Sequence, residues 1–204
     1  IARLRNAQLE GYKVCTVSML FTLGRPGALR DAIDELCRNV ERRIDEENSL
    51  VILSDRGVDE KTAPIPALLA VSAVHHYLVR KGKRHLSGLV VETGEPRDVQ
   101  HFATLVSFGA SGINPYLAFE TMVDMQQKGY LPAEYSHEDM LEHYITAIKK
   151  GLLKIMSKMG ISTIRSYRGS QIFEAVGLDE DFVERYFTGT PSRIGGIGME
   201  KVEE

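Results

Sequence analysis

The sequence predicts an α/β fold, with a parallel sheet of about five βα units that resembles a rudimentary or incomplete (β/α) barrel. Strand-like and helix-like runs alternate at least five times along the 204 residues, which is typical of parallel sheets with right-handed crossovers. The run 49–54 has an unbroken apolar centre, as in a strand that is buried on both faces of such a sheet. An open doubly wound sheet fits the same alternation.

Each expected element follows from its residue pattern. Segments rich in β-branched and apolar residues predict strands over 12–21, 49–54, 86–92, 110–114 and 161–167. Apolar residues at three- and four-residue steps predict helices over 26–47, 66–82, 96–109, 116–129 and 138–159, with two short helices near 169–176 and 179–187. Ser136 and Asp139 form a capping-box pattern at the start of the long helix, and Gly160 ends it.

The two ends of the chain suggest an excised segment. The first residues, "IARLRN", lack both an initial Met and the apolar core of a signal peptide. The last residues, "GGIGMEKVEE", are rich in glycine and charge. We therefore expect one α/β domain over 1–192, whose N-terminal portion is missing, followed by a hinge or linker over 193–204.

The composition argues against several classes of protein. The net charge of −3 gives no indication of nucleic-acid binding, and no run of about 18 apolar residues predicts a membrane span. Cys15 and Cys37 lie far apart in the sequence, so we expect free thiols in a cytoplasmic protein. The histidines form no HxxxH or HExxH pattern, so we expect no metal site built from them.

Polar side chains follow the expected strands, at the ends where parallel sheets place their sites. Because these ends share one rim, we expect the following residues to converge: Asp55, Arg56, Gly57, Glu92, Thr93, Glu95, Arg97, Asp98, Asn114, Tyr116, Ser166, Arg168 and Gln171. They can be loop starts and helix caps, or they can form an interface or a channel wall. No GxSxG, phosphate-loop or GxGxxG pattern accompanies them. We therefore expect no catalytic, cofactor-binding or metal-binding residue in this chain.

A basic stripe marks the end of the long helix and the segment after it. Lys150, Lys154 and Lys158 recur every fourth residue, and Arg165 and Arg168 follow. Lysines near a helix C-terminus complement its negative end, which gives the stripe a structural explanation. That explanation leaves out the two arginines. Lys154, Lys158, Arg165 and Arg168 are therefore candidate contacts for an anion or for a neighbouring domain.

A series of long motifs resembles the large chain of glutamate synthase. The motifs run in order from about residue 49 to residue 198 and read "SDRG", "APIPALLAVSAVHHYLVRKG", "VVETGEPRDVQHFATLVSFGASGINPYLAFET", "KKGLLKIMSKMGISTIRSYRGSQIFEAVGL" and "YFTGTPSRIGGIG". Such a colinear series is far more specific than one short motif. The region resembles the central domain, which joins the amidotransferase domain to the FMN-binding barrel and is similar to an incomplete form of that barrel.

The resemblance implies a division of labour between domains. The whole enzyme would make two glutamates from glutamine, 2-oxoglutarate and reductant, with FMN and an iron–sulfur cluster, while ammonia passes through an internal channel. Electrons would come from NAD(P)H through a reductase small subunit, or from ferredoxin. None of the family's catalytic residues carries over to a position in this chain. Its expected role is to link the glutaminase and FMN domains and to border the ammonia path.

The glycine-rich end is the expected place of that border. Ile194, Gly195, Gly196 and Ile197 are candidate channel or hinge residues, because they lie next to the expected domain junction. Two alternatives stay open. One is an independent FMN- or phosphate-binding barrel that uses the basic residues as anion contacts. The other is an interaction module whose basic stripe docks a partner domain.

Overall fold

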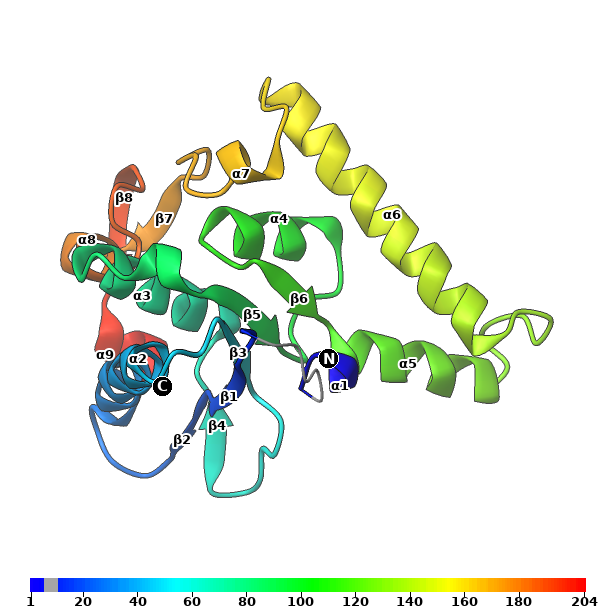
Figure 1. The fold of residues 1–204 in the computed structure, drawn as a ribbon, viewed down its shortest axis with the longest axis horizontal. Helices are drawn as coiled ribbons and strands as arrows, with labels where there is room; N and C mark the ends of the chain where they lie inside the picture. Colours follow the sequence, from blue (N-terminus) through cyan, green and yellow to red (C-terminus); the bar gives the residue numbers. More distant parts are fainter. Residues whose placement is uncertain (6–10) are drawn as a thin grey trace.

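A four-stranded parallel sheet forms the centre of the fold (Figure 1). The computed structural model describes residues 1–5 and 11–204. The strands lie in the order β1-β3-β5-β6, with bounds Val14–Ser18, Leu50–Ser54, Gly88–Glu92 and Gly112–Asn114. They follow one another in chain order, like part of a barrel wall, and within the described residues they form no closed barrel. The predicted α/β fold with an incomplete barrel is confirmed.

Three helices lie between the sheet strands in the sequence and pack side by side. They are α2 (Ala28–Asp45), α3 (Ala67–Arg80) and α4 (Val99–Ser107), and α3 contacts both of the others (Figure 1). Most of the surface of α3 is apolar and buried, which suits a helix enclosed by neighbours. Val51, Ile52 and Leu53 of β3 are fully buried, as the apolar run 49–54 predicts.

The end of the chain closes on the start of α2. Gly27 precedes α2 and has no side chain that could cap the helix. The carboxylate of Glu203, in α9 (Met199–Glu203), accepts hydrogen bonds from the backbone N–H groups of Gly27 and Ala28, each at 3.1 Å. A carboxylate at a helix N-terminus also interacts favourably with the helix dipole. The last turn of the chain therefore supplies the cap that α2 lacks.

Two small sheets flank the central one. β2 (Leu20–Thr22) pairs antiparallel with β4 (Thr62–Pro64). β7 (Ala175–Leu178) pairs parallel with β8 (Ser192–Ile197), and α8 (Glu180–Tyr186) connects them. The expected hinge or linker over 193–204 thus has regular structure in β8 and α9, and its role as a hinge stays a prediction.

The fifth predicted strand, over 161–167, is wrong. Residues Ile164–Tyr167 form the short helix α7, because the Thr163 hydroxyl accepts a hydrogen bond from the Ser166 backbone N–H at 3.2 Å and starts a helical turn. The helix expected near 169–176 is also wrong. Gly169 and Gln171 have positive φ angles of 74° and 53°, which stop a helix, and β7 begins at the end of this segment.

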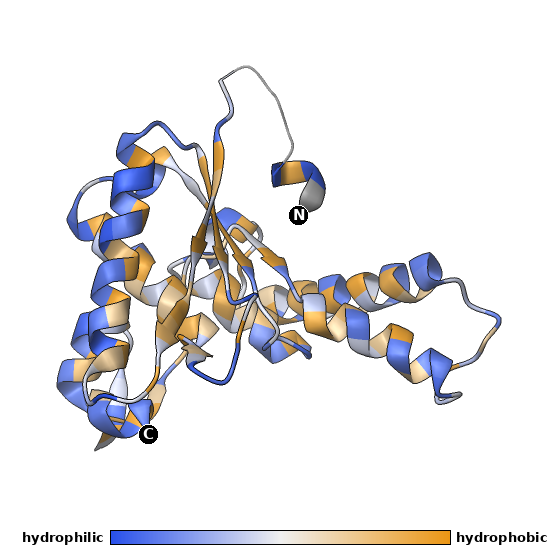
Figure 2. Cartoon of the chain, turned by 90° about the horizontal axis from the view of Figure 1, so that it is seen from below, coloured by the Kyte–Doolittle hydropathy of each residue, from blue (hydrophilic) through white to orange (hydrophobic). Residues whose placement is uncertain are grey.

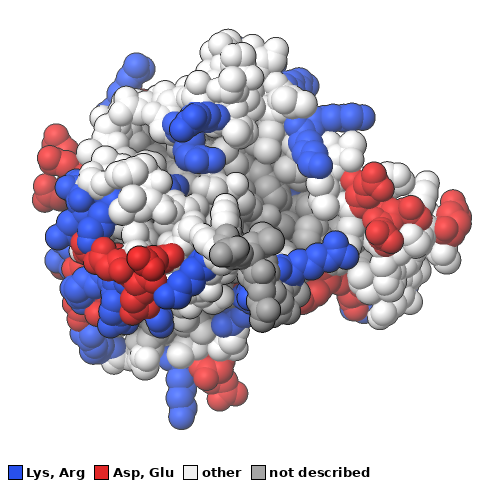
Figure 3. Space-filling model, in the orientation of Figure 1, with Lys and Arg blue, Asp and Glu red and all other residues white. Residues whose placement is uncertain are grey.

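A pair of helices projects from the body as an arm (Figure 2). The arm consists of α5 (Tyr116–Gln127) and α6 (His137–Lys158), and Ser136 and Asp139 form the predicted capping box of α6. Gly151 permits α6 to approach α4 closely, because a Cβ there would lie 2.4 Å from Cγ2 of Val99. Acidic side chains gather on the outer part of the arm (Figure 3), where Glu138 and Asp139 occupy the first turn of α6.

Two short helical segments complete the described structure. They are α1 (Ala2–Arg5) and the 3-10 helix η1 (Arg84–Leu86). Among the described residues, none of the helices combines the length and the apolar character that a membrane crossing needs.

Candidate functional site

The carboxyl ends of the sheet strands bring together the strand-end cluster, which we define as Asp55, Arg56, Glu92, Thr93 and Tyr116. The predicted convergence holds for these residues. Asp55 is 4% exposed, and its Oδ2 accepts hydrogen bonds from the Thr93 hydroxyl at 2.6 Å and from the Gly94 backbone N–H at 3.0 Å. Its other oxygen, Oδ1, is buried without a hydrogen-bond partner among the described residues.

Glu92 is the most compensated charge of the strand-end cluster. It is 2% exposed, and it accepts hydrogen bonds from the Ser54 hydroxyl at 2.6 Å, from Arg56 Nε at 3.2 Å and from the Arg5 guanidinium. Burial raises the pKa of Glu92, but the bonds from Ser54, Arg5 and Arg56 outweigh it and hold the pKa below its ordinary value. Glu92 is therefore ionised at neutral pH.

Arg56 joins the carboxylates to the aromatic ring of Tyr116. Its guanidinium carbon lies 3.8 Å from the ring centroid, a cation–π distance, and its Nη atoms reach Glu120 Oε1 at 3.4 Å. Burial, together with the nearby Asp55 carboxylate, raises the pKa of Tyr116 to about 12. The hydroxyl of Tyr116 therefore keeps its proton.

This geometry suits a structural polar network. Glu92 holds its charge through three donors, and Tyr116 does not ionise near neutral pH. Acid–base catalysis works best with groups that titrate near the working pH, and neither of these does. Across residues 1–5 and 11–204, no cluster of three or more His, Cys, Asp and Glu side chains is arranged to hold a metal ion.

The other predicted rim residues on the middle strands act as caps and connectors. Glu95 Oε1 accepts a hydrogen bond at 2.8 Å from the backbone N–H of Ala67, at the start of α3. Asp98 caps α4 in a capping box with His101. Asn114 ends β6, and its carbonyl accepts a hydrogen bond from the Thr93 backbone.

The remaining predicted rim residues make other contacts. The carbonyl of Arg97 accepts a hydrogen bond from the Tyr144 hydroxyl. Gly57, with φ 95°, lies in the turn after β3. Ser166 belongs to α7, and Gln171 lines a different pocket. Ser166, Arg168 and Gln171 were expected at the carboxyl end of a fifth strand, which does not form.

Arg5 and Ser54 belong to the site but were missed by the sequence reasoning. Ser54 directly precedes Asp55, so its place at a strand end was a usable signal. Arg5 reaches Glu92 from 87 positions earlier in the chain, and no local pattern indicates such a contact.

Arg168 lies apart from the other predicted anion contacts, because it alone of the four lines a pocket with Arg84. It lines what we call the basic pocket, a depression of about 360 Å³ formed by His75, Val79, Gly82, Arg84, His85 and Arg168. Lys154, Lys158 and Arg165 are exposed on α6 and α7 and do not line it. The sequence reasoning missed Arg84, which lies in η1 next to the start of β5.

The predicted channel or hinge residues form part of β8. All six residues of this strand are exposed, with Ile194 at 62% and Ile197 at 45%. Gly196 is required for the pairing with β7, because a Cβ there would lie 2.2 Å from the Gly177 carbonyl oxygen. The strand therefore presents two isoleucine side chains to the outside, beside the exposed Ser192 and Arg193.

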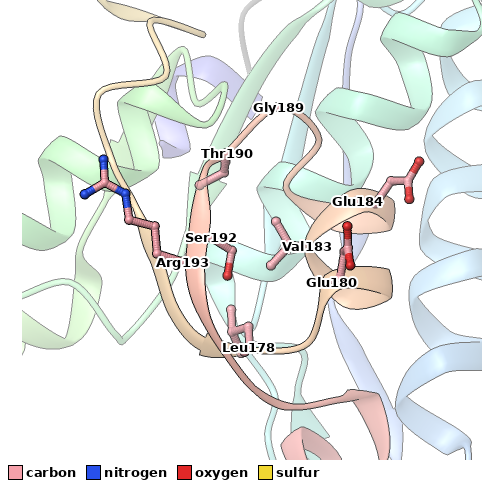
Figure 4. A pocket seen from close by; sticks show the side chains of 9 residues that line it. Leu178, Glu180, Val183, Glu184, Gly189, Thr190, Ser192 and Arg193 are labelled. Atoms are coloured by element: carbon pink, nitrogen blue, oxygen red, sulfur yellow. The ribbon is translucent and has the colours of Figure 1, made fainter.

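A pocket of about 500 Å³ lies beside β8 (Figure 4). Glu180 and Glu184 of α8 lie on one side of it and Ser192 on the other, while the guanidinium of Arg193 points away from these carboxylates. Arg193 instead reaches Glu174 at 3.5 Å. Gly195 also lines this pocket.

Comparison with known proteins decides the family. The family model described as "Glutamate synthase central domain" matches residues 1–179. The chain belongs to this family. The central domain is 47% identical over 176 residues to the NADPH glutamate synthase large chain of Bacillus subtilis (strain 168), which covers 86% of this chain and 11% of the relative. It is 42% identical over 207 residues to the ferredoxin-dependent glutamate synthase of Pyropia yezoensis, covering 95% of this chain and 13% of that protein.

The central domain therefore spans roughly a tenth of the length of these relatives. Among solved structures, it is similar to a mutant flavocytochrome b2 with pyruvate bound, with a TM-score of 0.50 and 16% identity. The similarity covers 74% of this chain and 37% of that one. At this identity the likeness shows the fold alone, and it agrees with an open sheet whose strands follow one another as in a barrel.

Proposed function

We propose that this chain is the non-catalytic central domain of a glutamate synthase large chain, where it links the glutaminase and FMN domains and borders the ammonia path. Membership of the family supports the proposal. The length of the relatives supports it too, because the match to this chain covers only 11% of the Bacillus subtilis protein and 13% of the Pyropia yezoensis protein.

The whole enzyme, in this proposal, is a cytoplasmic oxidoreductase with amidotransferase activity. It transfers the amide nitrogen of glutamine to 2-oxoglutarate and, with reductant, forms two glutamates. The relatives are named as NADPH, NADH and ferredoxin-dependent forms, so the partner is a reductase small subunit or ferredoxin.

FMN and the iron–sulfur cluster are assigned to other domains of that enzyme. The chain has two cysteines, Cys15 and Cys37, whereas an iron–sulfur cluster usually needs four ligands. Burial raises the pKa of Cys37 to about 12, so this thiol keeps its proton and is a poor ligand. The relatives give no support to an independent FMN- or phosphate-binding barrel.

The exposed strand β8 carries the proposed position beside the ammonia path. Exposed isoleucines on a strand are unfavourable in water unless another surface covers them, and β8 exposes Ile194 and Ile197. A sparsely polar wall also suits ammonia transfer, because it keeps out water and acidic groups that would protonate ammonia to ammonium. The next domain would then cover β8.

The test introduces a charge on β8 in the complete large chain. Ile194→Glu should lower glutamine-dependent glutamate synthesis and leave glutaminase activity unchanged, because the charge disturbs transfer between the sites. Leu153→Glu is the control, since Leu153 is equally exposed at 63% but lies on α6. If Ile194→Glu leaves the two activities coupled as before, β8 does not border the path.

A further inference from the structure

The basic pocket lies at the end of the sheet opposite the strand-end cluster. Arg84 and Ser87 immediately precede β5, and Gly109 precedes β6, so the pocket is at the amino ends of these strands. His75 contributes from α3, and Arg168 from the turn after α7. Nothing in the proposed function uses this pocket.

Arg84 is held in a fixed orientation by three hydrogen bonds. Its Nε donates to His75 Nδ1 at 3.0 Å, its Nη1 to the Ser87 carbonyl at 2.8 Å and its Nη2 to the Gly109 carbonyl at 2.7 Å. A guanidinium has five N–H donors, so two N–H groups of Arg84 remain. Fixing the group in advance reduces the entropy cost of binding a ligand.

Gly109 makes this arrangement sterically possible. Its φ is 120°, and a Cβ there would lie 2.5 Å from His75 Nδ1. Because Nδ1 of His75 accepts from Arg84, the neutral ring carries its proton on Nε2. His75 therefore offers another donor from a ring that lines the pocket.

Arg168 supplies a second guanidinium whose donors are not all used. Its Nε is buried and has no hydrogen-bond partner among the described residues. An unpaired buried donor is costly, and such atoms are rare in folded proteins. Within the described residues, no carboxylate forms an ion pair with Arg84 or Arg168.

The charges of the pocket favour an anion. Burial, and then the positive charge of Arg168, lower the pKa of Arg84 to about 10. Arg84 is therefore charged at neutral pH and is repelled by Arg168. Burial and the charges of Arg84, His76 and Arg168 lower the pKa of His75 to about 4. An anion between the two arginines would remove this repulsion.

We propose that the basic pocket binds a small oxyanion, a phosphate or a carboxylate, between the guanidinium groups of Arg84 and Arg168. Two oxygen atoms of one group match the paired N–H donors of arginine. The volume of about 360 Å³ accommodates such a group. The oxyanion is either a free small molecule or a carboxylate side chain from another part of the large chain.

The first arm of the test uses inorganic phosphate and the 204-residue chain. Isothermal titration calorimetry and thermal unfolding are measured at constant ionic strength, with chloride as the comparison anion. Phosphate should bind saturably and raise the melting temperature more than chloride does. Arg168→Gln should weaken phosphate binding by about tenfold or more, since one charge-assisted hydrogen bond is worth roughly that factor.

Arg165→Gln is the matched control. It removes the same charge three residues earlier, from an exposed position outside the pocket, so phosphate binding should remain. Arg168→Lys keeps the charge but loses the Nε donor and should bind with intermediate affinity. If circular dichroism shows that Arg168→Gln does not fold, Arg168→Lys takes its place in the test.

The second arm repeats the titration with the complete large chain. A retained response to phosphate supports a free anion as the ligand. A response that is lost in the unaltered large chain, but appears in the 204-residue chain, supports a carboxylate of another domain as the occupant. If the unaltered chain and its Arg168→Gln and Arg165→Gln variants respond alike to phosphate and to chloride, the proposal is overturned.

Discussion

At the carboxyl end of the sheet, Glu92 is a buried carboxylate surrounded by donors, whereas at the amino end Arg84 and Arg168 line one pocket and have no carboxylate partner among the described residues. Glu92 alone accepts bonds from three side chains. Arg168 keeps a buried donor without a partner in the described structure. Both ends are polar, but the charge of Glu92 is matched by donors of this chain, whereas the two arginines of the basic pocket have no carboxylate partner among the described residues.

The contrast shows why polarity alone does not identify a site. Buried charges that are paired and hydrogen-bonded hold a fold together, and removing one partner is costly. Buried charges that are not paired need a partner from elsewhere. The degree of compensation, which only the three-dimensional arrangement reveals, separates a structural network from a binding pocket.

The largest expected effect is the loss of the compensated carboxylate. Glu92→Ala should lower the free energy of unfolding by about 3 kcal/mol, because it leaves the donors of Ser54, Arg5 and Arg56 without their acceptor. Urea denaturation followed by circular dichroism measures the change.

The matched control for this prediction is Glu120→Ala. Glu120 accepts from the same Arg56, but its side chain is 58% exposed, so its loss should cost less than about 0.5 kcal/mol. Equal losses for the two variants would show that burial at the strand end does not strengthen the network.

The sequence predicts the sheet well because its signals are local. The runs at β1, β3, β5 and β6 are short and apolar, and they sit between helical patterns. Since parallel strands end on one rim, the sequence also predicts that Asp55, Glu92 and Thr93 meet. Capping at Ser136 is equally local and is confirmed.

The sequence fails where a local pattern fits two structures and where distant residues decide the structure. The β-branched run "ISTI" suggests a strand, yet Thr163 caps a helical turn there. The pairing of β7 with β8 joins segments on either side of α8, and no local pattern indicates it. The orientation of Arg84 depends on the carbonyl groups of Ser87 and Gly109, and no sequence pattern indicates these contacts.

A smaller effect is expected in the pH dependence of the basic pocket. The pKa of His75 is lowered to about 4 by burial and by Arg84, His76 and Arg168, whereas an unfolded histidine has a pKa of about 6.5. The unfolded state therefore takes up a proton first, and stability should fall as the pH drops from about 6.5 to 4. We expect the contribution of His75 to be about 1 kcal/mol or more.

Comparison of variants isolates this contribution. His75→Gln should show a smaller loss of stability over that pH range, and subtracting the two curves removes the titration of His76. His85→Gln, at the exposed edge of the pocket, should behave like the unaltered chain. Phosphate should also reduce the loss, because an anion favours protonated His75. Identical pH curves for all three chains would contradict the burial of His75 beside Arg84.

The smallest effect is expected from the lysines of the basic stripe. Lys154 and Lys158 are exposed on α6, and Lys158 lies in its last turn, where a lysine contributes less than about 1 kcal/mol through the helix dipole. The double variant Lys154→Gln, Lys158→Gln should change stability by no more than that amount and should leave phosphate binding intact. Calorimetry would decide between the two places for the anion. If this double variant loses phosphate binding while Arg168→Gln retains it, the anion binds to the lysine stripe and not to the basic pocket. The exposed lysines would then bind phosphate more strongly than the oriented Arg84 and its neighbour Arg168.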